Sequence, residues 1–189
     1  MLLKRLEWRG RMVSPDPLRL VFLDESSVNC AMTRLYGRAG KSERVNDYVP
    51  DVRFERTSVI STIRLDGGQA PFMFKGTLDG ALFAVYVEKV LAPTLKEGDM
   101  VVMDNLSAHK VAGAFRPIHE KGASVLFLPP YSPDYNPIEL AWSKVKAALR
   151  KAKAATFDEL VDAMRLALDG ITTHDIAGWF RHCGYDANI

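Results

Sequence analysis

Three acidic residues stand where the pattern places the end of a strand or the start of a helix. Asp24 follows the apolar run 18–23, Asp104 follows "MVVM" (100–103), and Glu139 heads an amphipathic segment. Carboxylates that converge repel one another unless a cation lies between them, and their hard oxygen atoms suit Mg²⁺ or Mn²⁺. Two such ions would activate a water or a sugar hydroxyl and stabilise the leaving oxygen of a phosphodiester.

Each acid also has an ordinary structural explanation. An Asp before a helix is a favoured N-cap, worth about 1 kcal/mol, which would account for Asp104. "NPIE" (136–139) resembles a capping box with Asn at N-cap, Pro at N1 and Glu139 at N3. Asp24 in "DESSVN" fits a strand that ends in a polar turn. Taken singly, none of the three is identified as a ligand, and the metal hypothesis rests on their convergence.

The apolar pattern predicts a mixed α/β sheet that would bring the acids together. The turn "DGGQ" (66–69) joins two strands into an antiparallel hairpin, and strand–helix–strand over 100–128 implies a parallel crossover. Ligands of such sheets bind beyond the carboxyl ends of parallel strands, where we expect Asp24 and Asp104. The predicted strands are 18–23, 57–65, 70–75, 100–103 and 124–128.

Helical periodicity predicts the layers that cover this sheet. A helix is expected after Asp79, where apolar residues recur at helical spacing, and "TFDE" has the spacing of a capping box. Pro117 weakens the second half of one predicted helix. The remaining predicted helices are 108–121, 138–153, 156–169 and 173–182. Along the chain, the predicted order is antiparallel strands first, then alternating α and β elements, then helices. This order indicates a mixed sheet with helices on its faces.

Composition narrows the class of protein. A chain of 189 residues with 48% hydrophobic and 25% charged residues suits one globular domain. The net charge of +2 gives no indication of nucleic-acid binding, so local patches must carry it. Two cysteines, Cys30 and Cys183, fit ordinary thiols in a reducing cytosol. No apolar run approaches the roughly 18 residues of a membrane span, and no GxGxxG follows a strand, which argues against a Rossmann-type enzyme.

Three segments resemble the signature blocks of the DDE transposases: "LDES" (23–26), "VVMDNLSAHK" (101–110) and "LPPYSPDYNPIELAW" (128–142). The similarity is greatest to the bacterial insertion-sequence branch of the mariner superfamily, in which 34 residues typically separate the second and third acids, as they do here. The resemblance covers about residues 18–185. It implies a ribonuclease H-like fold in which Asp24, Asp104 and Glu139 form a metal-binding catalytic triad.

The resemblance also implies an activity. A transposase of this kind would cleave DNA at transposon ends and transfer the strand into target DNA at TA sites, with two Mg²⁺ or Mn²⁺ ions. The active complex would be a homodimer on DNA, in the bacterial cytoplasm at the nucleoid, without membrane association.

The domain boundaries follow from the same comparison. Residues 1–17 are basic and are predicted to be a connector from an N-terminal helix-turn-helix DNA-binding region. Two explanations stay open for that region: this sequence is a catalytic fragment, or the gene is split and another reading frame encodes it. Residues 18–185 would be the catalytic domain and 186–189 a tail.

Several polar residues near the acids are candidates for DNA contact. His109 would orient a phosphate or a ligand, or would be a satisfied polar residue on the first helical turn. A basic stripe at i+7 and i+11 from Glu139 suits a DNA backbone, although a solvated helix face explains it equally well. The candidates are Asn105, His109, Lys110, Lys146 and Arg150.

Two alternatives stay open from the sequence. One is a non-catalytic or domesticated DNA-binding derivative, against which the intact set of three acids argues. The other is a ribonuclease H-like nuclease with a different substrate.

Overall fold

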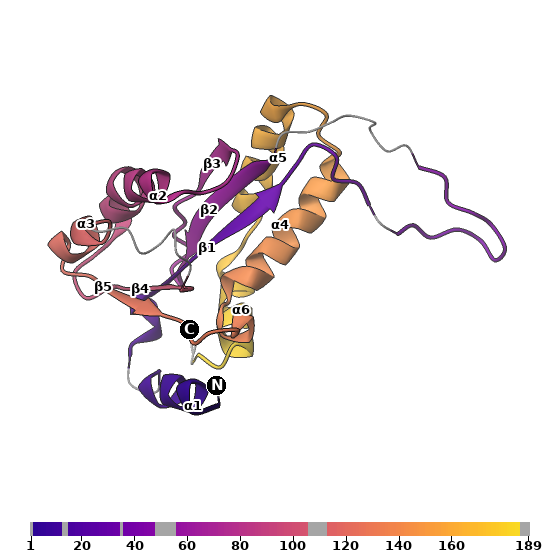
Figure 1. Cartoon of the computed structure of the whole chain (residues 1–189). Coiled ribbons are helices and arrows are strands. Elements are labelled where there is room, and N and C mark those ends of the chain that lie inside the picture. Colours follow the sequence, from indigo (N-terminus) through magenta and orange to yellow (C-terminus); the bar gives the residue numbers. More distant parts are fainter. Residues whose placement is uncertain (1, 13–14, 35, 48–55, 106–112, 186–189) are drawn as a thin grey trace.

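The structure is a computed structural model that describes residues 2–12, 15–34, 36–47, 56–105 and 113–185. These residues form one sheet with the strand order β3-β2-β1-β4-β5 (Figure 1). Strand β1 pairs antiparallel with β2 and parallel with β4, so the predicted combination of a hairpin and parallel strands is confirmed. The strands are β1 (Leu20–Val28), β2 (Thr57–Ile63), β3 (Phe72–Lys75), β4 (Met100–Met103) and β5 (Ser124–Phe127).

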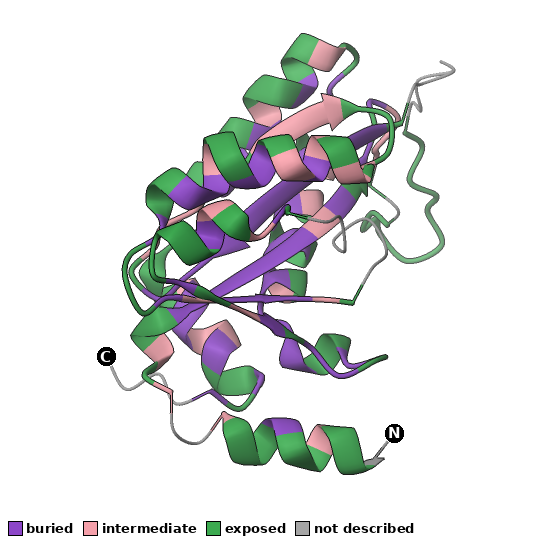
Figure 2. Ribbon diagram, turned by 60° about the vertical axis from the view of Figure 1, so that its left-hand side comes forward, coloured by how far each residue is buried: buried purple, intermediate pink, exposed green. Residues whose placement is uncertain are grey.

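Helices cover both faces of the sheet, as the sequence predicts (Figure 2). Successive side chains of a strand point to opposite faces. Leu20 and Phe22 therefore join the core beneath one helical layer, while Val21 and Leu23 join the core beneath the other. The first layer comprises α4 (Ile138–Ala152), α5 (Phe157–Asp169) and α6 (Thr173–His182), and the second comprises α2 (Gly80–Tyr86), its continuation through Thr94, and α3 (Arg116–Glu120).

Strand β1 is longer than predicted. The prediction ends the strand at 23, but it continues to Val28, which pairs with Thr57 of β2. The polar residues after Leu23 are compatible with a strand because β2 supplies the antiparallel ladder along this whole length. Asp24 therefore lies within a strand rather than at its end, and the prediction of its position was wrong in this respect.

The predicted helix over 108–121 is also wrong in part. Gly113 has a φ of +80°, which an α-helix does not accommodate, and α3 begins only at Arg116. Pro117 lies in the first turn of α3, where its missing N–H costs no helical hydrogen bond. Residues 108–112 lie outside the described part of the chain.

The basic segment at the N-terminus contains a helix, α1 (Leu2–Arg11), that packs on the domain (Figure 1). Trp8 is buried in the main core, and its indole N–H donates to the hydroxyl of Tyr185 at 3.2 Å. Helix α1 therefore packs against the end of the domain, at Tyr185 just after α6. In the described residues, every helix is too short or too polar to cross a membrane.

Candidate active site

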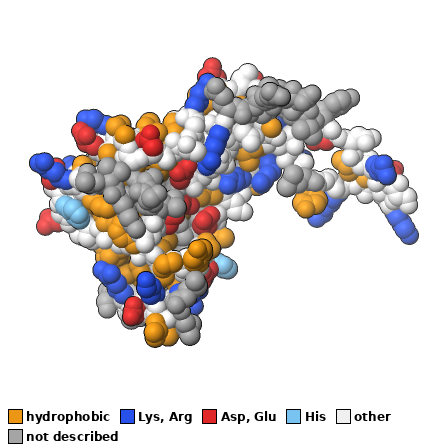
Figure 3. Space-filling view, in the orientation of Figure 1, with side chains coloured by type: hydrophobic (Ala, Val, Ile, Leu, Met, Phe, Trp, Pro, Cys, Tyr) orange, Lys and Arg blue, Asp and Glu red, His pale blue; other side chains and the backbone are white. Residues whose placement is uncertain are grey.

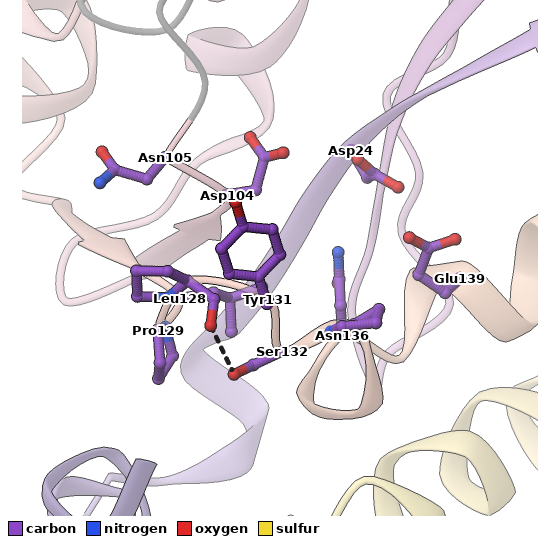
Figure 4. A pocket seen from close by; sticks show the side chains of 11 residues that line it. Asp24, Asp104, Asn105, Leu128, Pro129, Tyr131, Ser132, Asn136 and Glu139 are labelled. Atoms are coloured by element: carbon purple, nitrogen blue, oxygen red, sulfur yellow. Dashed lines mark hydrogen bonds between the residues drawn. The ribbon is translucent and has the colours of Figure 1, made fainter. Parts of the chain in front are cut away.

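The three acids line one pocket of about 430 Å³ at the edge of the sheet (Figure 4). Asp24 comes from the middle of β1, Asp104 from the residue after β4, and Glu139 from the first turn of α4. In the close view Asp24 lies between the other two acids, and its carboxylate points toward the side of Glu139. The rest of the lining is Asn105, Asn136 and the loop residues Leu128, Pro129, Pro130, Tyr131, Ser132 and Pro133.

The parallel register of the central strands sets Asp24 beside Asp104. Leu20 pairs with Met100 and Phe22 with Val102, an offset of 80 positions in each case. The same offset brings position 24 level with position 104, just past the last paired residues. Asp24 lies on the face of the sheet that carries Leu20 and Phe22, the face on which α4 packs.

Glu139 reaches the pocket because it is not used to cap its helix. The predicted capping box is wrong: α4 begins at Ile138 with Pro137 at the N-cap position, and no side chain caps it. A backbone bond from the N–H of Glu139 to the carbonyl of Asn136, 3.1 Å, turns the chain into the helix. The carboxylate lies in the first turn, where the partial positive charge of the helix N-terminus stabilises an anion.

The Asp24 carboxyl is destabilised in its charged form. It is nine-tenths buried, and burial together with the charges of Glu139 and Asp104 raises its pKa from an ordinary value near 3.8 to about 8. The N–H of Glu25 and the indole of Trp142 lower it in part. The buried indole nitrogen of Trp142 lies near the carboxyl without a hydrogen bond of full geometry among the described residues.

A second buried acid, Asp99, shows how this fold normally stabilises such a charge. The Asp99 side chain accepts hydrogen bonds from Arg64 Nη1 and Nη2 at 3.0 and 3.3 Å and from the N–H of Lys96 at 2.9 Å. In the described part of the chain, no comparable cation pairs with Asp24, and its charged neighbours in the pocket are acids. Asp99 is therefore a structural carboxylate with a compensating cation, whereas Asp24 lacks such a cation among the described residues.

The donor set of the pocket fits Mg²⁺ or Mn²⁺. Among the described residues, no three His, Cys, Asp or Glu side chains stand close enough to hold one ion together. A two-ion site does not require this, since Mg²⁺ takes one or two protein carboxylates and completes its shell with water and phosphate oxygens. A cation beside Asp24 would also offset the repulsion that raises the pKa of this group.

The other predicted contact residues are distributed differently. Asn105 lines the pocket and is exposed. Lys146 and Arg150 are half-buried along α4 and do not line it. His109 and Lys110 lie outside the described residues.

The Pro-rich loop before α4 contributes two tyrosines, Tyr131 and Tyr135, for which the sequence allows either contact with DNA or packing. Tyr131 has a left-handed φ of 54° and its side chain is 84% exposed at the pocket. Tyr135 is buried, with the guanidinium of Arg5 4.5 Å from its ring centre. Ser132 donates to the carbonyl of Pro130 at 3.3 Å (Figure 4). The two tyrosines therefore differ, because only Tyr131 is available to a ligand.

Charge is unevenly distributed on the face that carries the acids. Figure 3 shows acidic side chains gathered near the middle of this face, with Lys and Arg side chains toward the extended segment that includes residues 36–47. Among the described residues, the lining of the pocket contains no Lys or Arg.

The fold and this site can be compared with known proteins. The sequence profile described as DDE superfamily endonuclease matches residues 19–161, which is most of the chain. The chain belongs to this family. A comparison with curated protein sequences gave no match.

Solved structures show the same fold as this DDE superfamily endonuclease. The catalytic domain of Mos1 mariner transposase superposes with a TM-score of 0.66 at 13% identity, over 96% of this chain and 83% of that one. The mariner Mos1 paired end complex with Mg gives a TM-score of 0.75 at 13% identity, over 96% and 58%. The Mos1 strand transfer complex gives 0.69 at 15% identity, over 99% and 60%.

These similarities establish a ribonuclease H-like fold, as the sequence predicts. The DDE superfamily endonuclease described here spans about three fifths of the transposase chains in the Mos1 DNA complexes.

Proposed function

We propose that this chain is the catalytic domain of a transposase that cuts DNA phosphodiesters at transposon ends and joins the cut strand to target DNA. The observation that carries the proposal is the position of Asp24, which is buried beside two further carboxylates with no cation paired to it in the described residues. Membership of the DDE superfamily endonucleases supports it.

In the proposed reaction, Asp24, Asp104 and Glu139 would hold two Mg²⁺ or Mn²⁺ ions. The bound ions would supply activation of the attacking hydroxyl and stabilisation of the charge on the leaving oxygen. In the first step a water oxygen bonds to phosphorus while the bond to the 3′ oxygen breaks, and the released 3′ oxygen takes up a proton. In the second step the oxygen of this 3′-hydroxyl bonds to the phosphorus of a target phosphodiester and gives up its proton. The bond from that phosphorus to the target's own 3′ oxygen breaks, and this oxygen leaves and takes up a proton, so no covalent enzyme intermediate forms.

The DNA would run from the pocket along the basic side of α4. Lys146 and Arg150 would contact phosphates there by charge alone, and Asn105 would contact DNA at the pocket itself. His109 and Lys110, four residues or more beyond Asn105 in the chain, are proposed as further contacts on sequence grounds.

The biological setting belongs to the same proposal. The Mos1 relatives were crystallised as paired-end and strand-transfer complexes, and with Mn or Mg. By analogy we propose a homodimer that pairs two transposon ends, a TA target, and a helix-turn-helix portion that reads the ends. We assign the element to the bacterial insertion-sequence branch, at work on the nucleoid.

A DNA-nicking assay tests the proposal. The full chain, with and without a helix-turn-helix partner, is incubated with plasmid carrying the element's ends in Mn²⁺. The Asp104→Asn variant removes one proposed ligand, and Glu120→Gln removes an exposed acid that pairs with Arg116 on α3. We expect wild type and Glu120→Gln to nick and Asp104→Asn to lose at least about 10³-fold in rate.

The other outcomes separate the alternatives. Equal nicking by wild type and Asp104→Asn would overturn the catalytic assignment. Tight binding without nicking, even with the partner present, favours the domesticated DNA-binding protein. Metal-dependent cleavage of RNA–DNA hybrids but not of element ends favours the nuclease with another substrate.

A further inference from the structure

Asn136 is a buried polar residue in the wall of the candidate active site. It is 3% exposed, lines the pocket with the three acids and lies three positions before Glu139. Its amide nitrogen points into the pocket, toward the space between Asp24 and Glu139 (Figure 4). Asn136 thus directs a neutral amide at the place where the proposed chemistry occurs.

The backbone holds Asn136 firmly in place. Its N–H donates to the carbonyl of Pro133 at 2.9 Å, and its carbonyl accepts from the N–H of Glu139 at 3.1 Å. The backbone of Asn136 is therefore fixed relative to the acid at the start of α4. The side chain is confined by its burial, so little conformational freedom is lost when a ligand binds to it.

The amide is not explained by a structural hydrogen bond. Its Oδ1 is buried and has no hydrogen-bond partner in the described part of the chain. A buried acceptor without a donor destabilises the folded state, and an apolar side chain of similar size would avoid this cost. Polar groups kept at the expense of stability are characteristic of functional sites.

The chemistry of the pocket indicates which ligand suits the amide. The three carboxylates only accept hydrogen bonds when ionised, and they repel the anionic oxygens of a phosphodiester. A Lys or Arg here would attract the phosphate but would also pair with the acids and compete with the metal ions. An amide N–H donates to a phosphate oxygen and leaves the charge balance of the metal site unchanged.

We infer that Asn136 positions the substrate, by donating a hydrogen bond from its side-chain amide to a non-bridging oxygen of the phosphodiester that is cut. The inference rests on the proposed function, and it assigns to Asn136 a contact with substrate rather than with metal. Its loss slows the chemical step while the acids still bind Mn²⁺.

The test compares two side-chain amides of the full chain, each with a buried oxygen atom. Asn136→Leu removes the donor and keeps the number and branching of the side-chain heavy atoms. Gln69→Met is the matched control, because Gln69 lies in the turn between β2 and β3, away from the pocket, and its Oε1 is also buried without a partner among the described residues. Gln69 additionally donates to the carbonyl of Leu168 at 3.2 Å.

Three measurements are made on each protein: the nicking rate at saturating DNA in Mn²⁺, the Tm without metal, and Mn²⁺ affinity by calorimetry. We expect Asn136→Leu to nick about 10- to 100-fold more slowly, with unchanged Mn²⁺ affinity and an equal or higher Tm. Gln69→Met is expected to nick like wild type and to have a lower Tm, since it loses a hydrogen bond.

A phosphorothioate duplex identifies the contact. Sulfur at the non-bridging positions accepts hydrogen bonds poorly, so it slows wild type through the loss of this contact. Asn136→Leu has already lost the contact and is slowed less by the same substitution. Comparing the two proteins in Mn²⁺ cancels the effect of sulfur on the metal.

Several results would overturn the inference. These are wild-type nicking by Asn136→Leu, equal phosphorothioate effects in both proteins, or a fall in Tm larger than that of Gln69→Met. If wild type does not nick at all, the proposed function fails. The contact between Asn136 and the phosphodiester is then tested separately, by comparing the Mn²⁺-dependent DNA affinity of wild type and Asn136→Leu. Affinity equal to wild type in Asn136→Leu would then reject it.

Discussion

Arg5 and Asp134 form a two-pronged ion pair that joins the N-terminal helix to the loop lining the candidate active site. Nη1 of Arg5 donates to Oδ1 of Asp134 at 3.0 Å and Nη2 donates to Oδ2 at 2.5 Å. The hydrogen bonds lower the pKa of Asp134 and raise that of Arg5. Nη1 also donates to the hydroxyl of Ser132, 3.0 Å away, which lines the pocket. Helix α1 therefore braces the loop that carries the chain into α4.

The first prediction concerns this brace. Arg5→Ala removes both prongs and the contact with Ser132, so backbone opening in the loop 129–136 becomes more frequent. We expect amide hydrogen exchange there to rise about two- to fivefold, the range reached by exposed ion pairs. Lys4→Ala is the control, since Lys4 is exposed on the same helix. Unchanged exchange in Arg5→Ala would mean that the loop is held without α1.

The second prediction is a pH dependence of stability in the metal-free protein. The pKa of Asp24 is about 8 when folded and near 3.8 when unfolded, so between these values the folded chain binds a proton that the unfolded chain lacks. The free energy of unfolding then falls as pH rises from about 4 to about 8, by up to about 1.4 kcal/mol per pH unit.

Asp24→Asn isolates this contribution. The variant keeps the shape of the side chain and removes the titrating group, so its stability relative to wild type should increase steadily up to about pH 8 and then level off. Urea unfolding of both proteins from pH 4.5 to 9 measures the difference. Parallel curves would show that Asp24 is not destabilised by its neighbours.

The third prediction concerns metal. A ligand that binds only the folded state stabilises it by RT ln(1 + [L]/Kd), about 2.7 kcal/mol at a concentration of 100 Kd. We expect Mn²⁺ to raise the Tm of wild type and of Glu120→Gln, and to raise that of Asp24→Asn and Glu139→Gln much less. Na⁺ at matched ionic strength controls for screening. An equal rise in all four proteins would place the ion elsewhere.

The sequence predicted most elements that follow from apolar periodicity, including the hairpin, β4, β5 and the last three helices. It failed where a choice depended on partners distant in the chain. The extension of β1 requires β2 as its neighbour. "NPIE" fits a capping box as well as a site residue, and only the packing of the loop shows that Glu139 faces the pocket. The role of the acids as ligands stays a prediction.

The contacts of Arg5 and the burial of Asn136 were not predictable from local pattern. Arg5 and Asp134 are 129 positions apart, and exposed basic residues are common in any helix. Asn before Pro favours a turn in any protein, so its type gives no indication of burial. A buried amide without a partner becomes visible only once the surrounding loop is placed.

The fourth prediction separates the two buried acids. Asp99→Asn leaves Arg64 buried with one weaker partner, the exposed Asp66 3.2 Å from its Nε. We expect a loss of about 3 kcal/mol in the free energy of unfolding, measured in urea. Mn²⁺ should still raise the Tm of this variant, because Asp99 does not line the pocket. Loss of both stability and metal response would contradict independent roles for Asp99 and Asp24.

The last prediction concerns Trp142, whose buried indole lies beside Asp24 on the core side. The indole N–H lowers the pKa of Asp24, and the ring packs in the core of the α4 layer. Trp142→Phe keeps an aromatic ring there and removes the N–H. The pKa of Asp24 should rise further, so the pH at which stability stops falling should move upward. Mn²⁺ binding should weaken about tenfold, because the loss of a group that orients a metal ligand lowers metal affinity by such a factor.

Trp179→Phe is the control, because Trp179 packs against the same core and does not line the pocket. If Trp142→Phe and Trp179→Phe bind Mn²⁺ equally well and unfold with the same pH dependence, the indole serves packing alone.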